Sequence, residues 1–190
     1  MGLLRLFLFL GLVFHKIIWE LLKRRNKDSG TQKQTAKRPF IIFFKSFKIL
    51  VLTFLIIQTL FLDLFPINDQ SFQVRILGFT LYLIGLTTAV LGRVQLGENW
   101  LDIESIHVLP EQSLVNYGIY RFIRHPIYIG DTLLLTGLEL ALNSWLVLGV
   151  LFIIPIIVRQ ALVEESLLSQ KFPDYKSYSV RTKRFVPFIF

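Results

Sequence analysis

The stretch from Ile127 to Lys171 reads IYIGDTLLLTGLELALNSWLVLGVLFIIPIIVRQALVEESLLSQK, and it decides the fold. Its two apolar segments, about Ile127–Leu142 and Trp145–Lys171, are separated only by Asn143 and Ser144. A membrane-spanning helix needs about 20 mostly apolar residues. So short a connection allows only a tight helical hairpin. The sequence therefore predicts two antiparallel helices whose other ends lie side by side.

Three more apolar segments precede this hairpin, at about Leu3–Leu22, Phe40–Phe65 and Val74–Leu96. Of the 190 residues, 53% are hydrophobic and 18 are Phe. Soluble domains contain about 45–50% apolar residues even when Gly is counted. We therefore expect an all-α integral membrane protein with about five transmembrane helices and a helical C-terminal segment. Residues 1–190 form one membrane domain, in which residues 1–95 provide the three N-terminal spans.

The distribution of Lys and Arg predicts the orientation. The loop Lys23–Arg38 is rich in both, whereas Pro66–Gln73 contains neither. Positively charged loops are retained in the cytoplasm, so we expect an external N-terminus, with Gly97–Arg124 and the C-terminal tail in the cytoplasm. The net charge of +8 then reflects topology and attraction to anionic lipid rather than nucleic-acid binding, because the basic runs lack interleaved aromatic residues. With no Cys and scattered His residues, no metal site is expected.

A polar cluster precedes the hairpin, in the stretch Gly118–Gly130, which reads GIYRFIRHPIYIG. Pro126 fits the first turn of a helix, which places His125 near the N-cap. Free N–H groups and the positive end of the helix dipole suit an anionic ligand group there. Tyr128, in the same turn, offers an aromatic face and a hydroxyl. The alternative is an interfacial belt of Arg and Tyr that only anchors the helix.

A second polar cluster, Glu164 and Glu165, follows the apolar part of the last span. Adjacent residues on a helix point about 100° apart, so one carboxylate can bind a ligand while the other pairs with an arginine. The alternative is a solvated helix end. Further on, Arg181 can hold a carboxylate through two hydrogen bonds, or it contacts a phospholipid headgroup.

Other ionisable residues lie within the apolar segments. Asp131 follows Gly130 and either enters the cavity of the site or caps the helix. Glu139 lies near the external end of its helix, where its carboxylate is expected to reach water. We expect His15, together with Lys16 and Glu20, to serve helix packing.

The second half of the chain, about Leu96–Pro187, resembles the superfamily of isoprenylcysteine carboxyl methyltransferases and phospholipid methyltransferases. The resemblance rests on a set of motifs, each of which is weak alone. They are Leu96-Gly97-x-x-Trp100, Gly118-x-Tyr120-Arg121-x-x-Arg124-His125-Pro126-x-Tyr128-x-Gly130, Glu164-Glu165-x-x-Leu168, Phe172, Tyr175, Tyr178 and Arg181.

This resemblance implies an integral membrane methyltransferase that uses S-adenosyl-L-methionine without a Rossmann domain, and the chain contains no G-x-G-x-x-G motif. Residues 96–190 would form the cofactor-binding catalytic core, with its active site facing the cytoplasm. The implied acceptor is a lipid or prenylated molecule, as in protein-S-isoprenylcysteine O-methyltransferases, and the alternative is phospholipid N-methylation. Arg181 and Glu165 would be catalytic, and the candidate cofactor-binding residues are Arg124, His125, Pro126, Tyr128, Glu164 and Glu165.

Two alternatives of other classes remain. Sterol reductases share the Arg-His-Pro-x-Tyr-x-Gly segment and a C-terminal motif similar to Arg184–Phe190, and they bind reduced nicotinamide cofactor, NADPH. The adjacent glutamates and the short chain favour the methyltransferase. The other alternative is a non-catalytic membrane protein.

Overall fold

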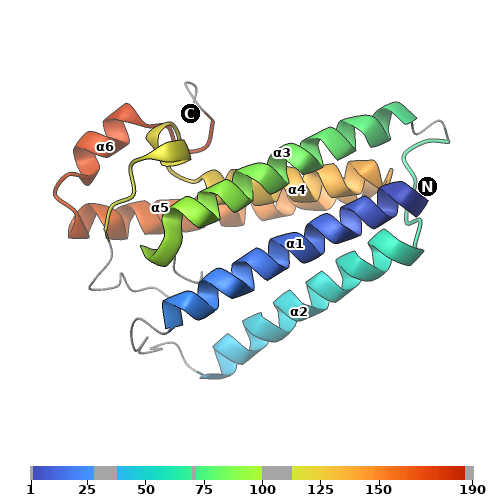
Figure 1. Cartoon of the computed structure of the whole chain (residues 1–190), viewed down its shortest axis with the longest axis horizontal. Helices are drawn as coiled ribbons and strands as arrows, with labels where there is room; N and C mark the ends of the chain where they lie inside the picture. Colours follow the sequence, from blue (N-terminus) through green and yellow to red (C-terminus); the bar gives the residue numbers. More distant parts are fainter. Residues whose placement is uncertain (1, 28–37, 70–71, 100–112, 187–190) are drawn as a thin grey trace.

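The computed structural model describes residues 2–27, 38–69, 72–99 and 113–186. Within these ranges the regular structure is helical, with two isolated β-bridges and no strand, as expected for the all-α class. Figure 1 shows the long helices side by side. The elements are α1 (Gly2–Lys27), α2 (Arg38–Phe61), α3 (Phe72–Leu96), η1 (Gly97–Asn99), η2 (Gly118–Arg121), α4 (Pro126–Ala141), η3 (Trp145–Gly149), α5 (Val150–Lys171) and α6 (Tyr175–Arg181).

In the described part of the chain, three segments are long and apolar enough to cross a membrane: Gly2–Arg24, Phe72–Asn99 and Trp145–Lys171. Two other apolar helices complete the bundle. The helix α2 has 24 residues, of which Ser46–Phe61 is a described apolar stretch, and α4 has 16 residues. The membrane class is therefore supported, whereas the count of five spans stays a prediction.

The helices α3 and α4 pack closely against each other, and glycines allow the approach. A β-carbon added at Gly85 would lie 2.3 Å from the backbone nitrogen of Leu134, and one at Gly137 would lie 2.2 Å from that of Tyr82. Real β-carbons are not found so close, so only Gly fits at these positions. Small residues at the contact face commonly let transmembrane helices pack this closely. The α3–α4 pair therefore fixes where the first turn of α4 lies.

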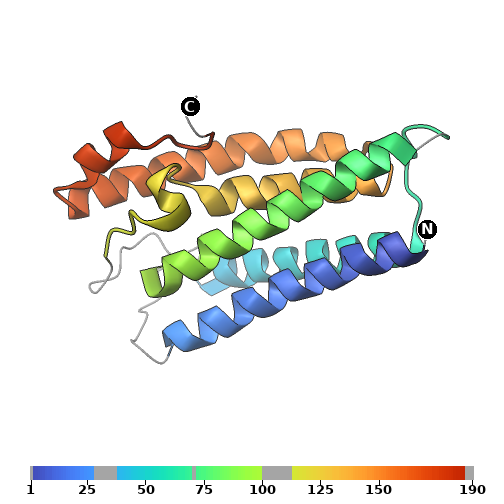
Figure 2. The ribbon, with the colours of Figure 1, turned by 45° about the horizontal axis from the view of Figure 1, so that its top comes forward.

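The N-terminal helix α1 packs against this pair, and Figure 2 shows it running alongside α2 below α3 and α4. Leu8 and Leu12 enter a buried apolar cluster with Leu134 and Leu138. The hydroxyl of Tyr82 donates a hydrogen bond of 2.7 Å to the carbonyl of Leu8. These contacts hold α1 to the core of the bundle.

The connection between α4 and α5 is the predicted tight hairpin. Asn143 has a φ of 61°, a left-handed conformation that Asn tolerates. The hairpin is joined to the α2–α3 connection, because the amide of Ile67 donates to the carbonyl of Asn143 and that of Trp145 donates to Phe65, both at 2.9 Å. These two connections lie at the same end of the bundle as the N-terminus (Figure 1). The prediction of a hairpin at this end is confirmed.

One prediction about this end of the bundle is wrong. The side chain of Glu139 does not reach water, because the residue is only 5% exposed. The Gln58 side-chain amide donates a hydrogen bond of 2.7 Å to its carboxylate. A buried polar group needs such a partner, and α2 supplies it across the helix interface.

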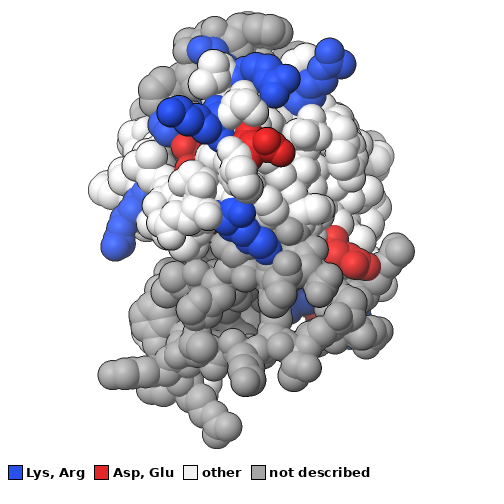
Figure 3. Space-filling view, turned by 90° about the vertical axis from the view of Figure 1, so that its left-hand side faces the viewer, with Lys and Arg blue, Asp and Glu red and all other residues white. Residues whose placement is uncertain are grey.

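The opposite end of the bundle carries α6, η2 and the ends of α3 and α5 (Figure 1). Figure 3 looks onto this end and shows Lys and Arg side chains spread over it. Exposed basic residues here include Arg121, Lys176, Arg181 and Lys183. The described parts of the segments predicted to be cytoplasmic therefore meet at one end. The motif residue Trp100 lies outside the described residues, as does much of the loop Lys23–Arg38.

Candidate functional site

The segment after α6 lies beside the residues that precede α4. The amide of Arg124 donates to the carbonyl of Lys183 at 2.8 Å, and that of Lys183 donates to Phe122 at 3.0 Å. The amide of His125 donates to the carbonyl of Arg184 at 3.2 Å. This short parallel pairing brings the C-terminal segment to the first turn of α4, where Pro126 occupies the predicted helix-start position.

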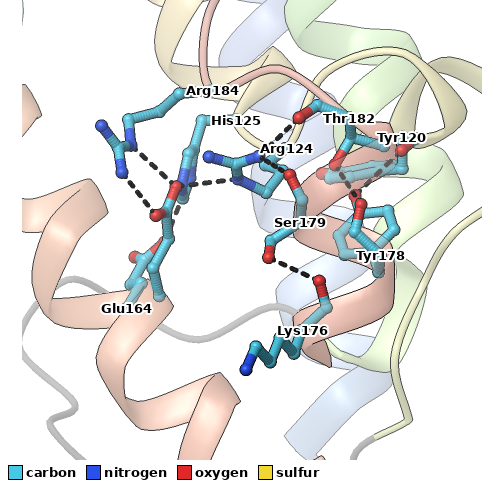
Figure 4. Close-up of polar contacts among 10 residues, drawn as sticks. Tyr120, Arg124, His125, Glu164, Lys176, Tyr178, Ser179, Thr182 and Arg184 are labelled. Carbon is cyan, nitrogen blue, oxygen red and sulfur yellow. Dashed lines mark hydrogen bonds and ion pairs between the residues drawn. The ribbon is translucent and has the colours of Figure 1, made fainter. Parts of the chain in front are cut away.

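Glu165 on α5 is the centre of the resulting cluster. Its Oε1 atom lies 3.0 Å from Nε of Arg124, 3.1 Å from Nε2 of His125 and 2.9 Å from Nε of Arg184. The Nη2 of Arg184 reaches Oε2 at 2.9 Å, so that pair is bidentate. Figure 4 shows Arg184, His125 and Arg124 converging beside Glu164. The predicted meeting of the two helix ends is therefore confirmed.

The charge of Glu165 is heavily compensated in this arrangement. Its side chain is 13% exposed and that of Arg124 is 11% exposed, so the contacts are partly shielded from water. The hydrogen bonds to Glu165 raise the pKa of the Arg184 guanidinium above its ordinary value. Arg124 also donates to the carbonyls of Ser179 and Thr182, at 2.9 and 2.6 Å. Arg124 thus ties α6 to α5, and this geometry favours a role in positioning.

Glu164 has a different environment from its neighbour. Its carboxylate accepts a hydrogen bond from the Tyr128 hydroxyl, and Nδ1 of His125 lies 3.6 Å from its Oε2. The side chain of Glu164 is 36% exposed. The rings of His125 and Tyr128 stack with centroids 5.5 Å apart. Of the two glutamates, Glu164 therefore offers a carboxylate that a cationic ligand group can reach.

Two buried tyrosines, Tyr120 and Tyr178, hold together the elements that carry the site. The Tyr178 hydroxyl donates to the carbonyl of Tyr120 at 2.9 Å, and the Tyr120 hydroxyl donates to Gly92 at 3.2 Å. Burial raises the pKa of Tyr178 to about 12 and raises that of Tyr120 as well. Both phenols therefore stay neutral at physiological pH, and they fix α6 against η2 and α3.

Arg181 is the one candidate that the fold does not bring into the cluster. Its guanidinium bonds to Ser177 in its own helix, with Nε 3.2 Å from the carbonyl and Nη2 3.4 Å from Oγ. It lines an open groove on the outer side of α6 together with Asp174 and Lys176. The proposed catalytic role of Arg181 stays a prediction.

Sequence reasoning did not assign a site role to Arg184, which supplies the bidentate contact to Glu165. The signal that could have found it is the C-terminal motif Arg184–Phe190, which sequence reasoning connects only with reductases. Phe185, within that motif, also reaches the site, with its ring centroid 5.7 Å from that of His125. Residues 187–190 of the motif lie outside the described residues.

Comparisons with known proteins find a methyltransferase family and relatives with two kinds of name. The phospholipid methyltransferase family matches residues 74–175. A probable protein-S-isoprenylcysteine O-methyltransferase from Oryza sativa subsp. indica is 28% identical over 129 residues, which are 66% of this chain and 68% of that protein. The nickel-cobalt-cadmium resistance protein NccN from Alcaligenes xylosoxydans xylosoxydans is 30% identical over 113 residues, 57% of this chain and 49% of the relative.

A solved structure supports the fold. The eukaryotic intramembrane Ras methyltransferase ICMT, an isoprenylcysteine carboxyl methyltransferase, superposes with a TM-score of 0.56 and 19% sequence identity. The match covers 82% of this chain but 55% of that protein, so the chain spans about half of the larger enzyme. The family match extends over more than half of the 190 residues and includes the Arg124–Tyr128 segment and both glutamates. The chain therefore belongs to the phospholipid methyltransferase family, within the superfamily of membrane methyltransferases that also contains the isoprenylcysteine carboxyl methyltransferases.

Proposed function

We propose that this protein transfers a methyl group from S-adenosyl-L-methionine to a lipid-like or prenylated acceptor at the cytoplasmic membrane face. The observation that carries the proposal is the cluster at the start of α4 and the end of α5. There Glu164, Tyr128 and His125 lie next to the compensated pair of Glu165 and Arg184. All but Arg184 fall within the region that matches the family.

The side chains present suit this cofactor. Its amino-acid end carries an ammonium and a carboxylate, and each needs a polar partner once it leaves bulk water. The partly exposed carboxylate of Glu164 and the Tyr128 hydroxyl can bind the ammonium. Arg184, whose side chain is 25% exposed, and the N-terminus of α4 suit the carboxylate. His125 and Pro126 form the wall between these two regions.

When bound, the cofactor supplies an activated methyl group on a sulfonium, so the protein needs no nucleophile of its own. The residues act by orienting the reactants and excluding water. Arg124 and Glu165 hold α5, α6 and the C-terminal segment in register. The His125 and Tyr128 rings close one side of the site. Residues 96–190 therefore supply the proposed catalytic core, and residues 1–95 supply most of the lipid-facing support.

The acceptor is proposed from the relatives. The similarity to a probable protein-S-isoprenylcysteine O-methyltransferase supports a prenylcysteine carboxylate. The matching family supports a phospholipid amine as the second candidate. In both cases the acceptor carries an apolar chain and would reach the site laterally from the lipid. Next to Glu164, α5 exposes Leu162 and Val163, which can contact such a chain.

Cofactor binding to the detergent-purified full chain tests the proposal. We expect S-adenosylhomocysteine, the product form, to bind in calorimetry and NADPH not to bind. Incubation with labelled S-adenosylmethionine and membrane extract should then yield a labelled lipid or prenylated product. Binding of NADPH alone would support the reductase, and binding of neither ligand would support a non-catalytic protein.

A further inference from the structure

An ion pair inside the bundle lies apart from the Glu165 cluster. Nε2 of His15 on α1 lies 3.0 Å from Oδ1 of Asp131 on α4. The His15 ring stacks on Trp19 with centroids 4.0 Å apart, which holds the imidazole in place. Asp131 had two alternatives, entry into the cavity of the site or a helix cap, and the structure instead pairs its side chain with His15 on α1.

Ionisable groups at this position are costly for a membrane protein. His15 lies within the apolar segment Gly2–Arg24, which is long enough to span a membrane. Such groups usually line a ligand or proton pathway, and a partly exposed ion pair adds little net stability. The apolar cluster around Leu8 and the Tyr82 hydrogen bond already attach α1. Helix attachment alone therefore does not account for the pair.

Asp131 is also close along α4 to a residue of the proposed cofactor site, Tyr128. Asp131 follows Tyr128 by three residues on α4, a spacing that places β-carbons about 5–6 Å apart on a helix surface. Tyr128 reaches toward Glu164 on α5, whereas Asp131 reaches toward His15 on α1. One turn of α4 thus links the two clusters. The side chains of His15 and Asp131 are 21% and 38% exposed, so a ligand from the lipid side can reach them.

We propose that His15 and Asp131 form a proton-accepting site for the methyl acceptor. This proposal rests on the proposed methyltransferase function and specifies an acceptor whose nucleophilic atom carries a proton, namely a lipid-linked ammonium. Within the described part of the chain, the polar contact of His15 goes to Asp131 through Nε2. The other ring nitrogen, Nδ1, can therefore receive a proton from the acceptor.

The chemical step is a proton transfer. The N–H bond of the ammonium breaks, its electron pair stays on nitrogen, and the proton binds Nδ1 of His15. The Asp131 carboxylate keeps its contact with Nε2 and orients the ring, and the imidazolium later releases the proton to water. The free amine then has the lone pair that a methyl transfer requires. A carboxylate acceptor, by contrast, needs no base.

Charge also favours the amine at this position. The carboxylate of Asp131 attracts an ammonium and repels a second carboxylate. Arg181, the residue predicted to orient a carboxylate acceptor, lies on the outer side of α6 and bonds within its own helix. The partly exposed carboxylate of Asp131 therefore fits a cationic acceptor, whereas the nearby cations Arg124 and Arg184 pair with Glu165.

The test uses Asp131→Asn and His15→Gln in the full chain. The matched control is Glu20→Gln, which removes an exposed carboxylate from α1 outside the pair. The acceptors are phosphatidylethanolamine and a farnesylcysteine carboxylate, each supplied in the same detergent micelles. Three quantities are measured for every protein: methyl transfer to each acceptor, its pH dependence, and calorimetric binding of S-adenosylhomocysteine.

We expect both variants to lose at least about tenfold in kcat with the amine near neutral pH, since general-base catalysis contributes about 10²–10⁴. Raising the pH toward the amine pKa of about 10 should restore the rate, because the amine then loses its proton to water. S-adenosylhomocysteine binding should be unchanged, Glu20→Gln should match the wild type, and Asp131→Glu should recover part of the rate.

The pH readout depends on the other charged or titratable groups around the pair. On α1, on α4 and on the helices that pack against them, such groups include Lys16 and Glu20 on α1, Lys48 on α2, Arg93 on α3, Tyr128 on α4 and Glu164 on α5. The control variant and the fully titrated profile separate their effects from that of His15. A loss without recovery at high pH would identify the pair as a structural contact and overturn the proposal.

Other outcomes separate this inference from the proposed function. Wild-type protein that methylates only the carboxylate acceptor would overturn the proton-accepting site and keep the methyltransferase. Equal losses with both acceptors would likewise overturn it. A wild-type protein that does not bind S-adenosylhomocysteine would refute the proposed function itself, and this inference with it.

Discussion

Arg184 and Glu165 face each other through two parallel hydrogen bonds, with Nε and Nη2 each 2.9 Å from a separate carboxylate oxygen. Glu165 belongs to the helical hairpin, whereas Arg184 follows the last helix of the described chain. This pair therefore closes the C-terminal segment over the start of α4. The first prediction concerns the consequence of opening it.

Arg184→Ala should weaken S-adenosylhomocysteine binding by at least about tenfold, or 1.4 kcal/mol. The reason is that the C-terminal segment loses its anchor beside His125 while the ligand loses a cationic partner. Arg184→Lys should restore only part of the affinity, because Lys lacks the bidentate fork. The measurement is calorimetric titration. Lys183→Ala, which removes an exposed side chain next to it, is the control, and equal affinity in all variants would exclude this role.

The second prediction separates the adjacent glutamates. Glu164→Gln should fold normally and bind S-adenosylhomocysteine poorly, because the proposed cofactor site uses the partly exposed carboxylate of Glu164. Glu165→Gln should lower the free energy of unfolding by about 1–3 kcal/mol, because Arg124 and Arg184 lose an ionised partner. Thermal unfolding in detergent and ligand titration measure the two effects. Interchanged phenotypes would assign the ligand contact to Glu165.

The third prediction concerns the close packing of α3 and α4. Gly85→Ala should destabilise the protein by about 1–3 kcal/mol or more, because the new methyl group overlaps the backbone of Leu134. The control is Gly149→Ala, whose β-carbon would meet no atom within 4 Å. The control should change stability by less than about 1 kcal/mol. Similar melting temperatures for the two variants would contradict so close an approach of the two helices.

The fourth prediction is the orientation in the membrane. Reporter fusions at the C-terminus and in the connection around Pro66 should report opposite sides, with the C-terminus cytoplasmic. Fusions at Pro66 and at Ser144 should agree with each other, because the two segments are paired at one end of the bundle. A common signal from the C-terminus and Pro66 would require a different number of spans.

The fifth prediction concerns access of the acceptor. Longer apolar chains on one acceptor headgroup should lower KM at nearly constant kcat, since each buried CH₂ contributes about 0.8 kcal/mol in both the ground and transition states. Steady-state kinetics over a series of chain lengths measure this effect. A water-soluble analogue with equal kcat/KM would show that the acceptor enters from water.

The sequence alone was sufficient to predict the helical segments, the hairpin and the proximity of His125 to the two glutamates. Apolar segments of this length form helices irrespective of their neighbours. The bilayer core offers no water, so the backbone N–H and C=O groups must form hydrogen bonds within the segment. The short Asn143–Ser144 connection then allows only an antiparallel arrangement of the two helices that it joins. The roles of Glu164 and Glu165 stayed open, since helix geometry says only that they diverge.

The tertiary structure decided which arginine completes the Glu165 cluster and which partners Glu139 and Asp131 have. After α6 the backbone turns extended at Thr182, with φ −115° and ψ 155°, and pairs with the segment before α4. That turn brings Arg184 to Glu165 and leaves Arg181 on the outer side. Glu139 and Asp131 likewise find Gln58 and His15 on helices far away in sequence. Such partners depend on which helix faces pack together, and this cannot be read from spacing along one helix.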